Sequence, residues 1–254
     1  MQCSVNSLVG YTMEATDGEI GKVAEFYFDD QTWTIRYLIL ESGNWLTGRK
    51  LLISPEAIIR MPGRSRSFPV NLTKEQIRNS PDIDTEKPVS RQQEMELYGH
   101  YPWQSYWGSG FYPGGVWGIT DPPAVMDDKI LQGEFSGIEA AADLRADDNP
   151  HLRSTKEVTS YRIHATDGDI GHVKDFIIDD QTWQIECLVV DLHNWFSGKK
   201  VLVPVRQVKN LEWSDSKVFV NLTIDSIKNS PAIDESEFIN PEGSIYGSHS
   251  MHLK

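Results

Sequence analysis

Seven histidines are the residues of this 254-residue chain best suited to binding a metal ion. Their spacing includes no pattern such as His-x-x-x-His, which would place two imidazoles on one face of a helix. His249 and His252 lie in a polar segment near the end of the sequence, where solvated side chains are the simpler interpretation. We therefore expect no metal site.

Two acidic pairs, Asp29-Asp30 and Asp179-Asp180, could in principle act in acid–base catalysis or bind calcium. An EF-hand loop needs oxygen ligands at alternate positions and a glutamate at the twelfth, and neither segment has them. Each pair is followed by Gln-Thr-Trp, and Asp side chains that accept from nearby backbone amides favour a turn. The sequence has no Gly-rich phosphate loop, nucleophile elbow or Cys-His pairing. We expect turns, no cofactor and no enzymatic activity.

Aromatic side chains are the better candidates for contact with a partner. Trp45 and Trp195 lie in Gly-containing loops, where an indole either caps the end of its domain or contacts a partner. Between residues 98 and 118, aromatic residues alternate irregularly with Gly and Pro. Such rings gain free energy on leaving water, so this segment should pack either on its own chain or on another protein. The candidate contact residues in it are Tyr101, Trp103, Tyr106, Trp107, Phe111, Tyr112 and Trp117.

The elements around these residues occur twice. Ala-Thr-Asp-Gly-Glu-Ile-Gly at residues 15–21 returns 150 positions later as Ala-Thr-Asp-Gly-Asp-Ile-Gly at 165–171. Asp-Asp-Gln-Thr-Trp at residues 29–33 returns at 179–183 with the same offset. A constant offset without gaps indicates two copies of one domain, with two independent cores. Because each copy has only about 80 residues, docking of the copies would add stability.

Each copy has the pattern of a small β domain. Residues alternate with a period of two over 23–40, and the second copy repeats this pattern. Asp17-Gly18 and Asp167-Gly168 favour tight hairpin turns. Thr73, followed three residues later by Gln, predicts the capped start of a short helix. The fold class is therefore mainly β, with two tandem small antiparallel barrels, each ending in a short helix.

The copies divide the chain into four parts. We expect domain 1 over residues 1–85, an irregular aromatic and acidic connector over 86–152, domain 2 over 153–236 and a polar tail over 237–254. Helix-forming residues at 90–97 favour a short helix within the connector. Roughly half of the net charge of -13 lies on the connector, so the two copies are nearly balanced.

Composition also limits the partners and the compartment. An acidic chain disfavours nucleic-acid binding, because phosphates need a basic surface. No apolar stretch approaches the roughly 20 residues of a membrane helix, and the first residues show no signal-peptide pattern. Two cysteines make no disulfide framework. We expect a cytoplasmic protein without membrane insertion.

The combined motifs resemble those of the PRC-barrel domain. The resemblance rests on Asp-Gly-Glu/Asp-Ile-Gly-x-Val, on Asp-Asp-Gln-Thr-Trp, on Gly-Lys-Lys-Val-Leu-Val-Pro at 198–204 and on Asn-Ser-Pro at 79–81 and 229–231. It spans residues 5–84 and 155–234. This domain is shared by the photosynthetic reaction-centre H subunit and a ribosome-maturation factor. The resemblance implies a non-enzymatic docking module without shared catalytic residues.

Duplicated architecture without duplicated chemistry predicts an interaction or scaffold protein whose partner is another protein or a second copy. One alternative is a small-ligand-binding protein or enzyme with a site in the cleft between the barrels, formed by Trp45, His193 or the acidic turns. Another, implied by the resemblance alone, is a role in an assembly like that of the H subunit or of the ribosome.

One pair of residues suggests how the copies dock. Arg36 and Glu186 occupy equivalent strand positions and carry opposite charges. Residues beside a pseudo-two-fold axis meet their own equivalents, so one hypothesis places this pair at the axis of an internal dimer. The alternative is two unrelated surface charges.

Overall fold

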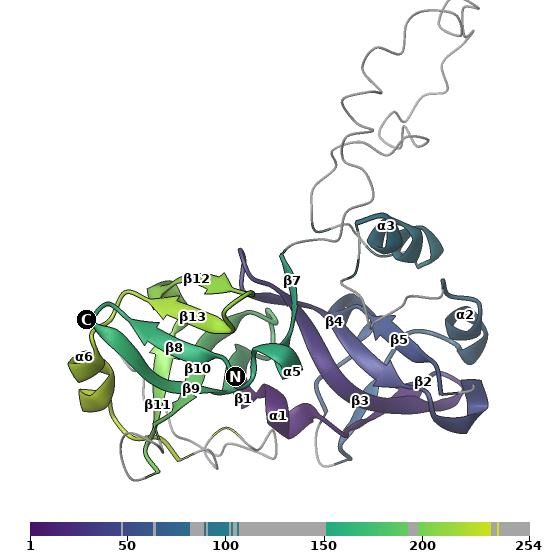
Figure 1. Ribbon diagram of the computed structural model, residues 1–254. Helices are drawn as coiled ribbons and strands as arrows, with labels where there is room; N and C mark the ends of the chain where they lie inside the picture. The colour runs from purple at the N-terminus through teal and green to yellow at the C-terminus, as the bar shows by residue number, and fades with distance from the viewer. Residues whose placement is uncertain are drawn as a thin grey trace, which may run out of the picture.

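The computed structural model contains two curled β sheets that lie side by side, with a helix over one of them (Figure 1). The mainly β fold in two similar halves is confirmed. Within the described parts of the chain, no helix has the length and apolar character needed to cross a bilayer. The described residues are 1–46, 48–62, 65–81, 89, 91–101, 103, 106, 151–192, 198–234 and 238.

Barrel 1 is formed mainly by residues 10–81. Four strands form an antiparallel meander: β2 (Thr12–Ala15), β3 (Gly18–Asp29), β4 (Thr34–Glu41) and β5 (Lys50–Ile53). A fifth, β6 (Ser67–Pro69), pairs parallel with β2, so the sheet is mixed rather than purely antiparallel as expected. The remaining elements are η1 (Gly43–Leu46), η2 (Pro55–Ala57) and α2 (Lys74–Arg78).

Barrel 2 repeats this arrangement with one additional strand. Its elements are β8 (Arg162–Ala165), β9 (Gly168–Asp179), β10 (Ile185–Asp191), β11 (Lys200–Pro204), η3 (Val205–Gln207), β12 (Val208–Glu212), β13 (Lys217–Val220) and α6 (Ile224–Asn229). β12 pairs with β13. The equivalent residues of barrel 1, 58–62, form no strand in the described part of the chain, although Ile58 makes an isolated bridge to Val70.

Local side-chain chemistry forms the predicted turns and caps. Asp29 Oδ1 accepts from the amides two and three residues ahead, at 2.9 and 3.0 Å, and Asp179 does the same in barrel 2. Thr73 and Gln76 form the reciprocal capping box at the start of α2. The helix expected over 90–97 is α3 (Arg91–His100).

Each barrel also receives a strand from the other half of the chain. β1 (Gln2–Ser4) precedes barrel 1 but pairs with β9 of barrel 2, with Gln2 opposite Asp179. β7 (Leu152–Ser154) precedes barrel 2 but pairs with β3 of barrel 1, with Leu152 opposite Asp29. A short helix follows each strand, α1 (Val5–Leu8) and α5 (Thr155–Val158). We call residues 1–9 arm 1 and residues 151–159 arm 2.

The exchange of arms crosses the division of the chain expected from the sequence. Residues 2–4, within the expected domain 1, belong to the sheet of barrel 2, and residues 153–154, within the expected domain 2, belong to that of barrel 1. Figure 1 shows β7 running across to barrel 1 and β1 lying against barrel 2.

The barrels meet at a pseudo-two-fold axis. Thr34 forms a β-bridge with its own equivalent, Gln184. The Ile35 amide donates to the Trp183 carbonyl at 2.9 Å, and the Ile185 amide donates to the Trp33 carbonyl at 2.6 Å. Both tryptophans have positive φ, 53° and 59°, a strained conformation for a non-glycine residue. Residues beside the axis therefore do meet their equivalents.

Arg36 and Glu186, however, have different partners. The Arg36 guanidinium donates to the Thr32 hydroxyl at 3.0 Å, and the Glu186 carboxylate accepts from the Gln2 amide. Thr34 and Gln184 form an antiparallel bridge, so the two strands run in opposite directions from it. Arg36 and Glu186 each lie two positions further along and are therefore on opposite sides of the bridge. The hypothesised contact is replaced by two separate ones.

The buried side chains of both barrels form one continuous cluster. The Phe28 and Phe176 ring centroids lie 5.5 Å apart across the interface, and those of Phe68 and Trp183 lie 6.3 Å apart. The expectation of two independent cores was therefore wrong. A domain of about 80 residues has only a modest core of its own, and the interface adds buried apolar surface to it.

A glycine of the repeated motif provides a test of this packing. A Cβ on Gly171 would lie 2.5 Å from the Asp191 carbonyl oxygen, whereas no atom of the described residues lies within 4 Å of a Cβ on Gly48. The two residues have similar φ, 65° and 71°. Gly171→Ala should lower the free energy of unfolding in urea by about 3–5 kcal/mol, and Gly48→Ala by only about 1 kcal/mol. Equal losses would contradict the close approach of β9 and β10.

Candidate functional site

A cleft of about 440 Å³ lies beside the axis, and three parts of the chain line it. Barrel 1 contributes Thr34–Arg36 of β4 and residues 58–61. Barrel 2 contributes its acidic turn, Asp180–Trp183, and the connector contributes Tyr98 and Tyr106. We call this the inter-barrel cleft. The exchanged arms keep its walls together, because each barrel is hydrogen-bonded to the other.

The lining of the cleft combines apolar side chains with charges of both signs. Ile59 is 62% exposed, and Met61 is half-buried beside it. Arg36 and Arg60 bring positive charge, and Glu56 and Asp180 bring negative charge. Surfaces that bind another protein commonly combine apolar and charged side chains in this way.

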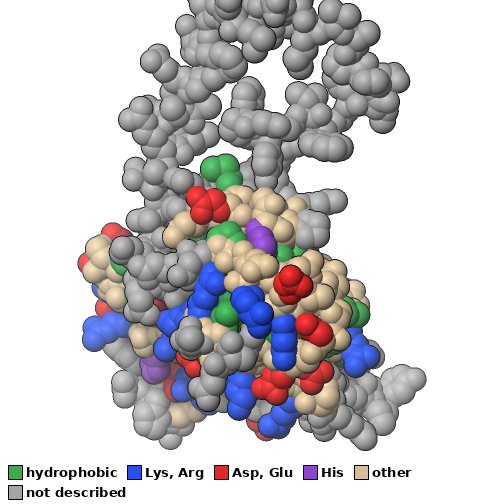
Figure 2. Space-filling model, turned by 90° about the vertical axis from the view of Figure 1, so that its right-hand side faces the viewer, with side chains coloured by type: hydrophobic (Ala, Val, Ile, Leu, Met, Phe, Trp, Pro, Cys, Tyr) green, Lys and Arg blue, Asp and Glu red, His purple; other side chains and the backbone are tan. Residues whose placement is uncertain are grey.

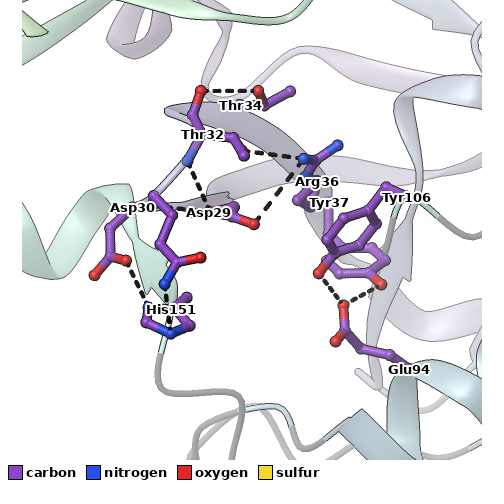
Figure 3. A network of polar contacts seen from close by, with 10 residues as sticks. Asp29, Asp30, Thr32, Thr34, Arg36, Tyr37, Glu94, Tyr106 and His151 are labelled. Atoms are coloured by element: carbon purple, nitrogen blue, oxygen red, sulfur yellow. Dashed lines mark hydrogen bonds and ion pairs between the residues drawn. The ribbon is translucent and has the colours of Figure 1, made fainter. Parts of the chain in front are cut away.

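Arg36 is held at the cleft by a set of contacts shown in Figure 3. Its guanidinium carbon lies 3.9 Å from the centre of the Tyr106 ring, a cation–π contact. Its Nη2 lies 3.0 Å from the Thr32 hydroxyl and 4.0 Å from the Asp29 carboxylate. Its Nε is buried and has no hydrogen-bond partner among the described residues. The side chain is therefore fixed before any partner binds.

Glu94 fastens the connector to barrel 1. Its side chain is fully buried, and Oε1 accepts from the Tyr37 hydroxyl at 2.7 Å and from the Tyr106 hydroxyl at 2.6 Å (Figure 3). Burial, followed by the negative charge of Glu94, raises the pKa of Tyr37 well above its usual value. The tyrosine thus remains a hydrogen-bond donor, and the buried carboxylate keeps its partners.

The sequence interpretation did not identify Glu94, although a signal was present. In a helix, residues 94, 97, 98 and 101 share one face. Leu97, Tyr98 and Tyr101 are apolar or aromatic and are buried here. A single carboxylate on such a face predicts a buried, hydrogen-bonded group.

The first aromatic residues of the connector pack on their own chain. Tyr98 and Tyr101 are buried, and Trp103 and Tyr106 are partly buried against the core. The Tyr101 and Trp103 rings stack with centroids 4.1 Å apart. For these residues the own-chain alternative is the one observed. The candidates Trp107, Phe111, Tyr112 and Trp117, His193, and the side chains of Trp45 and Trp195, lie outside the described residues.

A second hollow, of about 490 Å³, lies on barrel 2 and is lined in part by Arg162, Asp169 and His172. The His164 imidazole and the Lys217 ammonium, 3.3 Å away, both contact the Asp169 carboxylate. These contacts, chiefly the hydrogen bond from His164, lower the pKa of Asp169 and make it a poor proton acceptor. Among the described residues, no group of three or more His, Cys, Asp or Glu could hold a metal ion.

Double-mutant cycles test the contacts of Arg36. Arg36→Ala combined with Tyr106→Leu should show a coupling of about 1 kcal/mol in the free energy of unfolding, because both remove one cation–π contact. Arg36→Ala with Glu186→Ala should be additive to within about 0.5 kcal/mol. Tyr106→Phe keeps the ring and serves as the control, so its cycle with Arg36→Ala should show little coupling. Strong coupling of Arg36 to Glu186 would contradict the observed register.

Comparison with known proteins agrees with this architecture. The family model of the PRC-barrel domain matches residues 4–65 and, separately, residues 163–226. None of the curated proteins compared with the chain matches it. Each match covers strands of one barrel and its acidic turn. The chain therefore belongs to the PRC-barrel family and carries the domain twice, in tandem.

Proposed function

We propose that this protein is a non-enzymatic interaction scaffold that binds a partner protein at the inter-barrel cleft. One observation carries the proposal: the cleft is lined by both barrels and by the connector. A partner in the cleft would contact a surface that exists only when the two halves are assembled. The assembled pair of barrels would therefore have a binding site that a single barrel lacks.

The residues of the cleft suit this role. Ile59 is the most exposed apolar side chain of the lining, and exposed apolar groups gain free energy when a partner covers them. Arg36 is already ordered by Tyr106 and Thr32, so that binding a partner would cost little side-chain entropy. Arginine beside an aromatic ring is common among the residues that dominate binding energy.

The outer face of barrel 1 is a weaker candidate. Figure 2 shows Lys and Arg side chains spread over this face together with Asp and Glu, and only scattered apolar groups. A surface of mixed charge without an apolar patch is typical of a solvated face. The cleft is therefore the better candidate.

Charge placed in the cleft should remove partner binding. The full chain and its Ile59→Glu variant would be used as bait under native conditions, with Met95→Glu as the matched control. Met95 is 38% exposed on α3, outside the arms, and does not line the cleft. Proteins recovered by the wild type and by Met95→Glu should fall at least about tenfold with Ile59→Glu. Unchanged recovery would contradict binding at the cleft.

A second candidate function is the binding of a small molecule in the same cleft. Its volume falls within the roughly 300–1,000 Å³ typical of ligand pockets. Arg36 and Arg60 would suit an anionic group, and Ile59 and Trp183 an apolar one.

Thermal unfolding with a set of metabolite anions tests this candidate. A ligand should raise the Tm of the wild type by a few degrees, and the Arg60→Gln variant should lose most of that shift. Arg162→Gln, on barrel 2 and outside the cleft, is the control. A shift that survives Arg60→Gln would place the ligand elsewhere.

A further inference from the structure

We propose that the arms and the faces they join are also a self-association surface, and that the partner is a second copy of this chain. Barrel 1 of one chain would exchange arms with barrel 2 of a second chain. Barrel 2 of the first chain would do the same with barrel 1 of the second, which completes the dimer. Each of these two barrel pairs would have the contacts seen within the single chain. This surface adjoins the inter-barrel cleft, with which it shares Asp180.

The interface has the pattern of a symmetric dimer. The Asp180 amide donates to the Met1 carbonyl at 2.8 Å, and the Asp30 amide donates to the His151 carbonyl at 2.8 Å. The strand pairings β1 with β9 and β7 with β3 have the same register after the 150-residue offset. A surface in which each contact occurs twice, with the roles reversed, is isologous. Such a surface can also be completed by another chain.

The contacts between the halves are extensive and specific. Arm 1 buries Val5 and Leu8, and arm 2 buries Leu152 and Val158. The Ser4 hydroxyl donates to the buried Asp175 carboxylate, which also accepts from the Asn6 amide at 3.0 Å. None of these contacts requires that both halves belong to one chain.

Arm 2 makes the corresponding contacts on barrel 1. The Ser154 hydroxyl donates to the Glu25 carboxylate, and the Phe26 amide donates to the Thr155 hydroxyl at 3.2 Å. Arg153 Nε donates to the Asp30 carboxylate at 2.8 Å. Arg153 can therefore be used to weaken the exchange by charge reversal.

The arms can be exchanged within one chain, which we call closure within a chain, or between two chains. The connector determines which of the two is more populated. The 44 residues 107–150 join Tyr106 covalently to His151, and a covalent link gives the second half an effective concentration on the order of 1 mM. Closure within one chain should dominate at micromolar protein. After refolding at a chain concentration of about 0.5 mM, about a third of the chains should be closed with a second chain. After refolding at 10 μM, this fraction should be about one per cent.

The test uses full chains that carry a specific protease site inserted between residues 128 and 129. One preparation has an N-terminal tag and the other a C-terminal tag. The two are mixed, unfolded in urea, refolded at 10 μM or 0.5 mM, separated by size and then cleaved. We expect a dimer that grows with concentration and that cleavage converts to monomer-sized complexes. Complexes that carry both tags should be recovered from the dimer alone.

Charge-reversal variants sharpen the result, compared on material with matched far-UV circular dichroism. Asp30→Arg on the N-tagged chain and Arg153→Glu on the C-tagged chain place like charges together in closure within either chain and opposite charges in closure between the two, so at 10 μM they should raise the yield of doubly tagged complex at least about tenfold. Arg162→Glu, at an exposed position of β8 and outside the arms, should leave the yield unchanged. The proposal is overturned if the chain stays monomeric at 0.5 mM or if cleavage leaves a dimer-sized particle. Separation of the halves on cleavage would overturn it as well.

Discussion

The main-chain hydrogen bonds between the arms and the long strands β3 and β9 are the constraint on which the rest of the molecule depends. Each of these 12-residue strands pairs with two neighbours of its own barrel and, at its end, with the arm of the other half. The arms cover backbone groups that would otherwise form an exposed edge. The same pairing determines how the barrels lie beside each other and therefore creates the cleft.

The two copies differ where they line this cleft. In barrel 2 the residues from 208 to 212 pair as a strand, and their equivalents in barrel 1 do not. Residues 58–61 of barrel 1 line the cleft instead, and they place Ile59 and Arg60 at its surface. The connector adds Tyr106, which Glu94 holds and which in turn orders Arg36. Together these differences turn two similar barrels into one asymmetric surface.

The elements that local chemistry determines could be predicted from the sequence. The turns at Asp29 and Asp179, the capping box at Thr73 and the repeated strands follow from residues within a few positions of one another. The exchange of arms could not be predicted in this way, because a short alternating segment indicates a strand but not its partner. Nothing within Gln2–Ser4 or Leu152–Ser154 indicates that the partner is a strand of the opposite barrel.

The same limit explains the contacts of Arg36 and the position of Glu94. Equivalent positions in the repeat suggested an axis between the copies as one of two alternatives, but the register at that axis depends on Thr34 and Gln184. The apolar face of the helix around Glu94 could have predicted that this carboxylate is buried. Its two tyrosine partners, at positions 37 and 106, are too distant in sequence for spacing to reveal.

Hydrogen exchange of the native protein, residue by residue in increasing urea, tests most directly whether the arms make the two barrels one cooperative unit. The account predicts that the slowest amides of β3 and β9 and those of both arms open together, with one free energy and one dependence on urea. Loss of protection in one barrel while the other remains protected would contradict it.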